Sequence, residues 1–229
     1  YPIELQAQGA RRRTTLAGGL LPLPTTTSSG VGVGRGRGWG YNGGVHIVGV
    51  SGSLQARSST AAVLASIGDL VRLRATANAP VGAACATAPT FEVFRGIEEL
   101  PHFNPDRDVE PPPAEVAQWR STLAAADAIV IATPEYAHGY PGALKDALDW
   151  IVGSGELVDT PVLLVTASGS GGVRAGAALA PVIEVMSARL VGPISIWGVS
   201  PKVTEGRLTD PDDLDALAAA VDLLLALAT

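Results

Sequence analysis

Residues 128–150 read AIVIATPEYAHGYPGALKDALDW and change character twice. The first five residues, AIVIA, form an apolar run that is typical of a buried strand. The next stretch, TPEYAHGYPG, carries more aromatic and ionisable side chains than a loop that only reverses the chain would need. From residue 141 to residue 152 the pattern is that of an amphipathic helix. A buried strand, a loop rich in functional groups and a helix in this order indicate an alternating α/β protein.

The same alternation continues on both sides of this stretch. Apolar runs at residues 45–50, 91–94, 161–168 and 193–199 predict four more strands, and helical spacing predicts helices at 58–75, 111–126, 173–190 and 210–227. Because the strands are apolar throughout and alternate with helices, we expect a parallel sheet with helices on both faces. Right-handed crossovers leave two common strand orders, and five strands favour the flavodoxin-like one. We therefore predict an α/β, doubly wound, five-stranded parallel sheet of order 2-1-3-4-5.

The first 44 residues differ from the rest of the chain. They are dominated by Gly, Thr, Ser and Pro and show neither hydrophobic period, so we predict a disordered or low-complexity N-terminal extension and a folded domain over residues 45–229. The arginines at 11–13 loosely resemble a twin-arginine export signal, but the apolar patch after them is short and interrupted by proline. Residues 38–43 fit the pattern G-x-G-x-x-G, but they precede the first strand, so we interpret them as a chance match.

Charge and composition exclude several classes of protein. The net charge is −6, and since residues 1–44 sum to +4, the remaining residues carry −10. An acidic domain of this kind argues against a nucleic-acid surface, and no apolar run is long enough to span a membrane. The single cysteine excludes an intramolecular disulfide and a cysteine-based zinc site. We expect no metal site and a cytoplasmic location, since few cysteines fit a reducing compartment.

Three loops of the predicted sheet carry the candidate site. Ligands of doubly wound sheets bind beyond the carboxyl ends of the strands, at the point where the strand order reverses. The loop after the first strand, residues 51–60, reads SGSLQARSST and places several hydroxyl groups before a helix N-terminus, which is what a phosphate monoester needs. The alternative is that Ser58 or Ser59 only caps the helix, which would leave three hydroxyl groups unexplained.

The other two loops suit a flat ring. After the third strand, Pro134, Glu135, Tyr136 and His138 are expected to wall and contact a planar group. After the fourth strand, the glycines in residues 167–176 allow the backbone to approach a ligand closely. An aromatic-rich dimer contact is the alternative, and it is compatible with a ligand site.

The chain resembles the NADPH-dependent FMN reductase family of flavodoxin-like enzymes, which includes quinone and chromate reductases. The resemblance rests on GSLQARSST at 52–60, on TPEYAHGYPGALKDALDW at 133–150 and on SGSGG at 168–172, and it extends over residues 45 to about 200. The second motif is long and highly specific, whereas the first is a partial match. Gln55 stands where the family usually has arginine, and Thr60 and Ala137 stand where it usually has asparagine.

The resemblance implies FMN and NADPH as cofactors. By resemblance, Ser53, Ser58 and Thr60 hold the phosphate, Pro134, Glu135, Tyr136 and His138 contact the isoalloxazine, and Gly171 and Gly172 close its edge; the predicted cofactor site also includes Ser51, Gln55, Arg57, Ala137, Ser168 and Gly169. Ala137 removes a polar side chain near the ring, so flavin affinity is the property that this departure would change.

The implied reaction passes a hydride from NADPH to FMN and then electrons to a small second acceptor, such as a free flavin or a quinone, by a ping-pong mechanism. Because the flavin supplies the chemistry, no catalytic side chain is predicted. A homodimer or homotetramer is expected by the same resemblance. A non-catalytic flavodoxin-like electron carrier is the alternative. A serine hydrolase is a remote one, because the chain has three histidines and many serines but no G-x-S-x-G motif.

Overall fold

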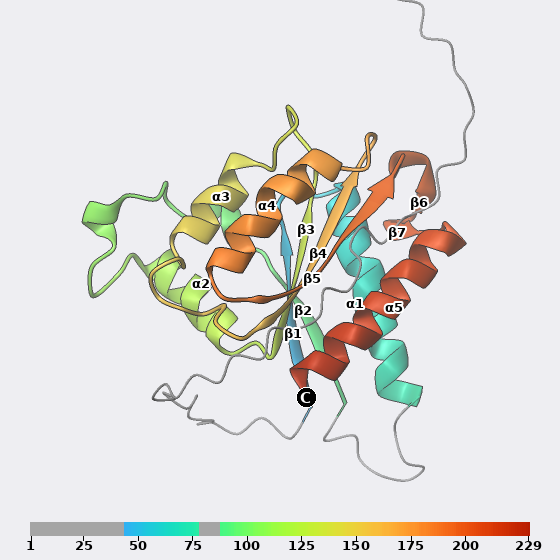
Figure 1. The fold of residues 1–229 in the computed structure, drawn as a ribbon, viewed down its shortest axis with the longest axis horizontal. Helices are drawn as coiled ribbons and strands as arrows, with labels where there is room; N and C mark the ends of the chain where they lie inside the picture. Colours follow the sequence, from blue (N-terminus) through green and yellow to red (C-terminus); the bar gives the residue numbers. More distant parts are fainter. Residues whose placement is uncertain (1–43, 78–87) are drawn as a thin grey trace, which may run out of the picture.

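The computed structural model describes residues 44–77 and 88–229 (Figure 1). The predictions made for residues 1–43, which comprise the extension, the arginine cluster and the glycine motif, lie outside the described residues. The main elements are β1 (His46–Ser51), α1 (Ser59–Ala77), β2 (Thr90–Phe94), α2 (Ala114–Ala124), β3 (Ala128–Thr133), α3 (Gly142–Asp149), β4 (Pro161–Ser168), α4 (Val173–Val185), β5 (Arg189–Trp197) and α5 (Pro211–Ala228). The five strands pair in parallel in the order β2-β1-β3-β4-β5, which confirms the predicted topology.

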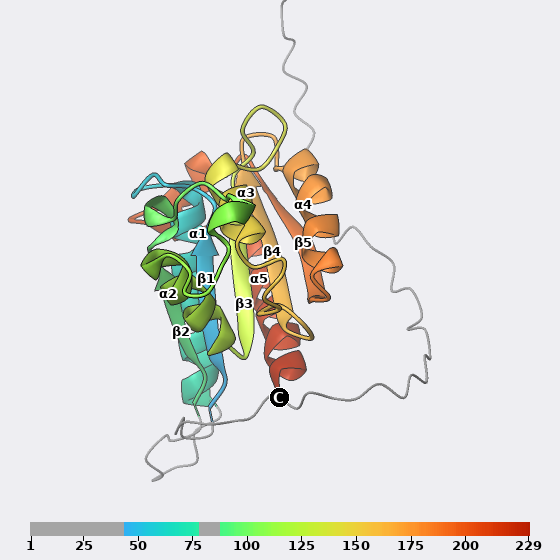
Figure 2. The same ribbon diagram turned by 90° about the vertical axis from the view of Figure 1, so that its left-hand side faces the viewer.

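Helices cover both faces of the sheet. Helices α1 and α5 lie on one face and α2, α3 and α4 on the other (Figures 1 and 2). Successive residues of a strand point to opposite faces, so Ile47 packs with the first pair of helices and Val48 with the second group. Each central strand is therefore buried on both sides, which explains why it is apolar throughout.

The structure differs from the predicted elements after β4. Helix α4 ends at Val185 instead of continuing to residue 190, because Ser187 adopts a left-handed conformation with φ 61°. Strand β5 then begins at Arg189, four residues before the predicted start, and its pairing with β4 shifts register between Leu163 and Val165. A strand with a proline at its centre is tolerated here because β5 lies at the edge of the sheet.

Several short elements were not predicted from the sequence. They are three 3₁₀ turns, η1 (Ile97–Glu99), η2 (Pro105–Arg107) and η3 (Ser200–Lys202), and a hairpin of β6 (Val203–Thr204) with β7 (Arg207–Leu208). Elements of two or three residues are too short to show a hydrophobic period.

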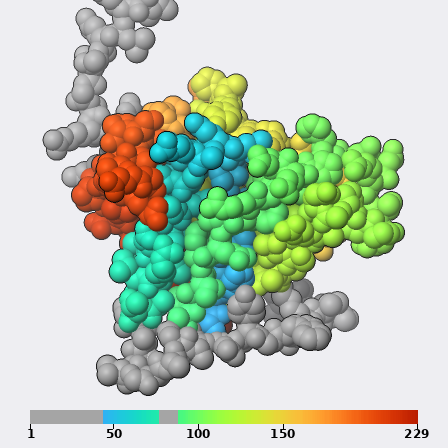
Figure 3. Space-filling view, turned by 180° about the vertical axis from the view of Figure 1, so that it is seen from behind, coloured from blue at the N-terminus to red at the C-terminus, as the bar shows by residue number. Residues whose placement is uncertain are grey.

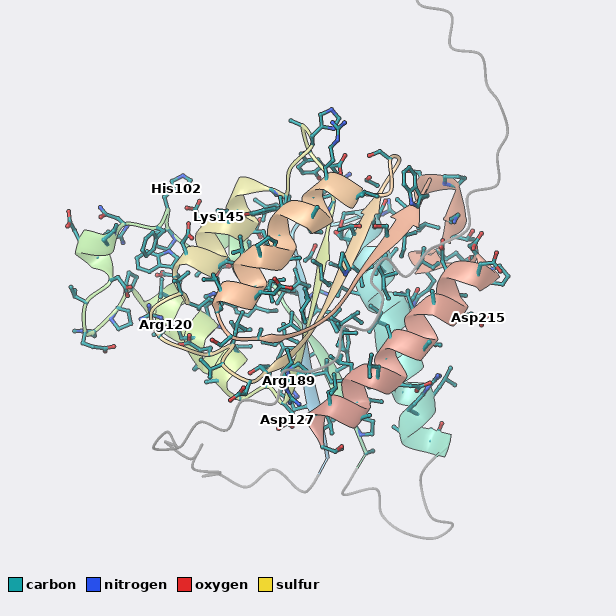
Figure 4. All side chains as sticks on the ribbon, viewed as in Figure 1. His102, Arg120, Asp127, Lys145, Arg189 and Asp215 are labelled. Carbon is teal, nitrogen blue, oxygen red and sulfur yellow. The ribbon has the colours of Figure 1, made fainter. Side chains whose placement is uncertain are left out.

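Hydrogen bonds close the amino-terminal edge of the sheet, where Figure 4 shows Asp127 and Arg189. The Asp127 carboxylate accepts a hydrogen bond of 2.8 Å from the N–H of His46, which opens β1. The Arg189 guanidinium donates to the carbonyl of Asp159 at 3.0 Å and to the carbonyl of Leu227, near the end of α5, at 2.8 Å. A ligand site is therefore expected at the opposite end of the sheet, beyond the carboxyl ends of the strands.

Candidate functional site

The strand register brings the three predicted loops to the same edge of the sheet. Ser51 at the end of β1 pairs with Ala132 of β3, and Thr133 pairs with Thr166 of β4. The N–H of Gly52 donates to the carbonyl of Ala132 at 2.8 Å, so the pairing continues one residue into the loop. We refer to residues 52–58 as loop one, residues 134–141 as loop three and residues 169–172 as loop four.

A cleft of about 250 Å³ lies between these loops. Its walls include nine of the residues predicted for the cofactor, namely Ser53, Gln55, Ser58, Thr60, Pro134, Glu135, Tyr136, Ser168 and Gly169, together with Ser59, Ala167, Val199 and Ser200. In Figure 3 the blue atoms of loop one lie between the orange-red segment that follows β5 and the green segment that follows β2. Val199 and Ser200 come from the connection after β5, which the sequence reasoning did not include.

The other predicted residues lie outside the walls of the cleft. They are Ser51, Arg57, Ala137, His138, Gly171 and Gly172. Arg57 is exposed on loop one, and Gly171 and Gly172 are buried. The nine predicted residues in the walls can contact a ligand in the cleft, whereas these six do not line it.

Loop one ends in a chain of hydroxyl groups at the start of α1. The Ser58 hydroxyl accepts a hydrogen bond of 3.1 Å from the N–H of Ala61, and thus caps the helix as the alternative interpretation proposed. Thr60 is fully buried, and its hydroxyl lies 2.9 Å from that of Ser58 and 3.0 Å from that of Ser51. Thr60 therefore holds the neighbouring hydroxyl groups in place from inside.

The first N–H groups of α1 lie beside the cleft. The first N–H groups of a helix have no partner within the helix. The N–H groups of Ala61 and Ala62 are bonded to Ser58, but those of Ser59 and Thr60 have no acceptor among the described residues. Both residues line the cleft, but Thr60 is fully buried and Ser59 is half-buried. The N–H of Ser59 is therefore the donor that, with the helix dipole, favours an anion there.

Loop three is connected to loop one through Tyr136. The Tyr136 hydroxyl lies 3.3 Å from that of Ser53, so the two loops are joined across the cleft. Tyr136 and Gly139 exchange two backbone hydrogen bonds of 2.9 Å and enclose a tight turn. The two residues inside it, Ala137 and His138, have φ angles of 49° and 66°, which is the type I′ pattern that asparagine and glycine favour.

Glu135 connects loop three to loop four. Its carboxylate is 5% exposed and accepts hydrogen bonds from the N–H groups of Arg174 and Ala175, at 3.0 and 3.2 Å, and from the Ser170 hydroxyl at 3.0 Å. It therefore caps α4 from another loop, and the His138 ring lies 3.5 Å away. Glu135 lines the cleft, but its carboxylate oxygens are engaged by loop four.

These contacts decide the charge of Glu135. Burial by itself raises the pKa of the Glu135 carboxyl, but the hydrogen bonds from Ala175, Ser170, His138 and Arg174 together outweigh it and hold the pKa below its ordinary value of 4.5. The carboxylate is thus ionised near neutral pH and complements the positive end of the α4 dipole.

The glycines of loop four have two different roles. A Cβ atom on Gly171, which has a φ of +78°, would lie 2.3 Å from the Trp197 ring, and one on Gly172 would lie 2.6 Å from Thr166. Gly169 lines the cleft, and a Cβ atom there would meet nothing within 4 Å. Only Gly169 of these three therefore offers its backbone to a ligand.

The three histidines lie beside hydroxyl or carboxylate groups. His46 lies 3.0 Å from the Thr90 hydroxyl and 3.3 Å from a Glu92 oxygen. His102 pairs with Asp146 at 2.7 Å on the α3 side of the molecule (Figure 4), and His138 pairs with Glu135. Among the described residues, the ring contacts given for the three histidines are thus to threonine and carboxylate groups.

Residues 44–77 and 88–229 contain no cluster of three or more His, Cys, Asp or Glu residues that could hold a metal ion. No helix in this part of the chain is both long and apolar enough to cross a membrane.

Replacing Gly171 with alanine should lower the free energy of unfolding by at least about 2 kcal/mol. The new methyl group collides with the Trp197 ring, and alanine tolerates the left-handed backbone conformation of residue 171 less well than glycine. Gly169→Ala is the matched control and should stay within about 0.5 kcal/mol. Urea unfolding curves of the three proteins measure both changes. Equal losses for the two variants would contradict the packing that we describe.

Ala137→Asn should raise the free energy of unfolding by about 0.5–1 kcal/mol, because asparagine adopts the left-handed conformation at lower cost than alanine. Ala137→Val should lower it, since β-branched residues are the least tolerant of positive φ. Thermal unfolding of the pair should therefore give shifts of opposite sign. Shifts of the same sign would mean that the left-handed conformation at residue 137 does not determine how these substitutions change stability.

Glu135→Gln should lower the free energy of unfolding by about 1 kcal/mol at pH 7, because the variant loses the charge that caps α4. Since the folded pKa is depressed, the contribution of the carboxylate is complete above the ordinary value of 4.5 and is lost as the pH falls through the folded value. Denaturant titrations from pH 7 to pH 3 should show the difference between the two proteins shrinking. Glu184→Gln, near the other end of α4, serves as control and should cause no loss; a difference for Glu135 that is independent of pH would disprove the charge effect.

The chain has relatives of known activity. Residues 45–200 match the family model described as NADPH-dependent FMN reductase. The NADH:(hydroxy)cinnamate reductase subunit CrdA of Vibrio ruber is 40% identical over 100 residues, which cover 42% of this chain and 49% of that protein. The quinone reductase of Escherichia coli K12 is 31% identical over 132 residues, which cover 53% of this chain and 69% of that protein.

A solved structure shares the fold. The flavoenzyme NAD(P)H:(acceptor) oxidoreductase of Paracoccus denitrificans superimposes with a TM-score of 0.67 at 22% identity, over 80% of this chain and 97% of that one. The chain spans about half the length of the first curated relatives that it matches, with 49% for the Vibrio protein and 44% for an NADPH azoreductase of a Bacillus species. The family model matches well over half of the chain. The resemblance inferred from the loop sequences is thereby confirmed, and the chain belongs to the NADPH-dependent FMN reductase family.

Proposed function

We propose that this domain binds FMN in the cleft and passes reducing equivalents from NAD(P)H to a small second acceptor. The observation that carries the proposal is the cleft itself, whose walls combine an unbonded helix N–H and hydroxyl groups with flat or apolar side chains. The family membership agrees with it, as do the reductase activities for which the relatives are named.

The residues present fit a flavin mononucleotide. The N–H group of Ser59 and the Ser58 hydroxyl would hold the phosphate, and the buried Thr60 would keep that hydroxyl in place. Pro134, Tyr136 and Ala167 give the other end surfaces against which a planar ring can lie, and the open backbone of Gly169 allows close approach. The Gln55 side chain, which stands in the usual place of an arginine, can donate hydrogen bonds but adds no charge.

Bound FMN would supply the redox chemistry, which is hydride acceptance from a nicotinamide followed by electron transfer to the acceptor. The protein side chains are then required to bind and orient, and we assign none of them as acid or base. Glu135 is unsuited to proton transfer to a ligand, because its carboxylate is bonded to the N-terminus of α4. Ping-pong kinetics follow if both substrates use the same flavin face in turn.

A non-catalytic FMN-binding electron carrier is the second candidate. It would use the same cleft, so geometry does not separate the two. Turnover does: steady NADPH oxidation with FMN and a quinone supports the enzyme, and FMN binding without turnover supports the carrier. The homo-oligomer and the cytoplasmic location that the sequence suggested stay predictions.

Ser59→Asp tests the phosphate end of the cleft. The new carboxylate occupies the first position of α1, where its interaction with the helix dipole stabilises the fold. At the same position it repels a phosphate. We expect the Kd of FMN to rise by about tenfold or more, the Kd of riboflavin, which lacks the phosphate, to stay unchanged, and the fold to remain stable. Flavin fluorescence titration measures both affinities.

Ala114→Asp is the matched control, because it places the same charge at the first position of α2, away from the cleft. It should leave both affinities as they are. A Ser59→Asp variant that binds FMN as tightly as the unchanged protein would refute the phosphate site, and an unchanged protein that binds no flavin would refute the proposal as a whole.

A further inference from the structure

A second hollow, of about 280 Å³, lies on the other side of loop one from the cleft. It is bounded by loop one, by the first two turns of α1 and by the segment that follows β2, which Figure 3 shows in green beside the blue atoms of loop one. Its walls are Ser51, Ser53, Leu54, Gln55, Ala56, Ala61, Leu64, Ala65, Val93, Phe94, Arg95, Ile97 and Glu98. Ser53 and Gln55 belong to both spaces, so the hollow and the cleft share a wall.

The hollow has the composition of a small-molecule site. Leu54 is 53% exposed, and it faces a space whose other walls include Leu64 and the half-buried Phe94. Such apolar walls with a few polar groups are typical of pockets for organic ligands. The polar groups include Arg95 and Glu98, and the structure gives neither side chain an ion pair or hydrogen-bond partner among the described residues. These two groups are thus available to a ligand.

The position of the hollow defines what can reach it. A molecule whose phosphate lies at the N-terminus of α1 can extend over Ser53 and Gln55 in either direction, into the cleft or into the hollow. The volume is close to the lower limit of about 300 Å³ for ligand pockets, so it suits one ring system with its sugar and not a whole dinucleotide. The ligand must therefore reach the hollow from a phosphate near the start of α1, and it must fill the hollow with one ring system and its sugar. A dinucleotide, which carries a second ring system beyond its phosphates, does both.

We propose that this hollow binds the adenosine half of a dinucleotide. The purine covers Leu54 and Phe94, and the Glu98 carboxylate accepts a hydrogen bond from its exocyclic amine. Arg95 and Gln55 donate to ring nitrogens or to phosphate oxygens. The proposal rests on the proposed function in one respect, namely that loop one holds the phosphate between the two spaces. Two molecules carry this group here. FAD in place of FMN places its own pyrophosphate on loop one, whereas NAD(P)H places its adenosine in the hollow and its pyrophosphate over Ser53 and Gln55, beside the phosphate of bound FMN.

Ala65→Phe tests the proposal, because Ala65 lines the hollow and not the cleft, so that the added ring fills the hollow alone. If FAD is the source, its Kd rises by about tenfold while that of FMN is unchanged. If NAD(P)H is the source, the KM of NADPH rises by about tenfold while that of reduced nicotinamide mononucleotide, which lacks adenosine, is unchanged. Ala219→Phe, on the exposed side of α5, is the matched control and should change none of these values.

Glu98→Lys is the second variant, for the case in which Ala65→Phe does not fold. Because Glu98 is exposed, reversing its charge should preserve the fold. It should weaken the same adenosine-bearing ligand and leave its adenosine-free counterpart unchanged. Unchanged affinities for both adenosine-bearing ligands in a folded variant would overturn the proposal. Direct binding of 5′-AMP, followed by ligand-observed NMR in the absence of flavin, tests the hollow without turnover. Signal that Ala65→Phe abolishes supports the hollow even if FMN turnover fails. Signal that Ala65→Phe leaves unchanged, or no binding of 5′-AMP to the unchanged protein, counts against it.

Discussion

The parallel pairing of β1 with both β2 and β3 is the constraint on which the site depends. The chain leaves β1 through loop one toward α1 on one face of the sheet, and it leaves β3 through loop three toward α3 on the opposite face. Because the two connections diverge where the strand order reverses, a crevice is left between them. Loop four then closes the far side from β4. The cleft is thus a result of topology before any side chain is considered.

The fold was predictable because each element carries its own local signal. Buried parallel strands are apolar without interruption, and the right-handed crossover rule leaves few orders for five of them. The errors lie where the controlling interaction is not local. After the early end of α4, the carbonyl of Ser187 accepts a hydrogen bond of 2.9 Å from the N–H of Asp159, and the start of β5 pairs with Pro161 of β4. Neither leaves a periodic pattern in the sequence.

The loops that line the cleft were predictable from the sequence, but the contacts that hold those loops together were not. Glu135 and Tyr136 were placed against a flat ring because they are polar or aromatic and lie in the right loop. The structure shows that Glu135 holds loop four and that Tyr136 reaches Ser53 of loop one, so loop three also fixes the shape of the cleft. Contacts between loops that are distant in sequence, such as residues 135 and 174, have no signature in one sequence. The same holds for Val199 and Ser200, which reach the cleft through the connection after β5.

The electrostatics of the cleft suit an acidic protein. The chain carries a net charge of −6, so a phosphate is not attracted by the surface as a whole. Backbone N–H groups at the start of α1 and hydroxyl groups ordered by Thr60 provide short-range donors that carry no net charge. Such donors act only within contact distance, and their direction is fixed by the helix. An arginine at position 55 is therefore not essential for holding an anion here, and Gln55 preserves the hydrogen-bonding capacity of that position while it loses the long-range attraction.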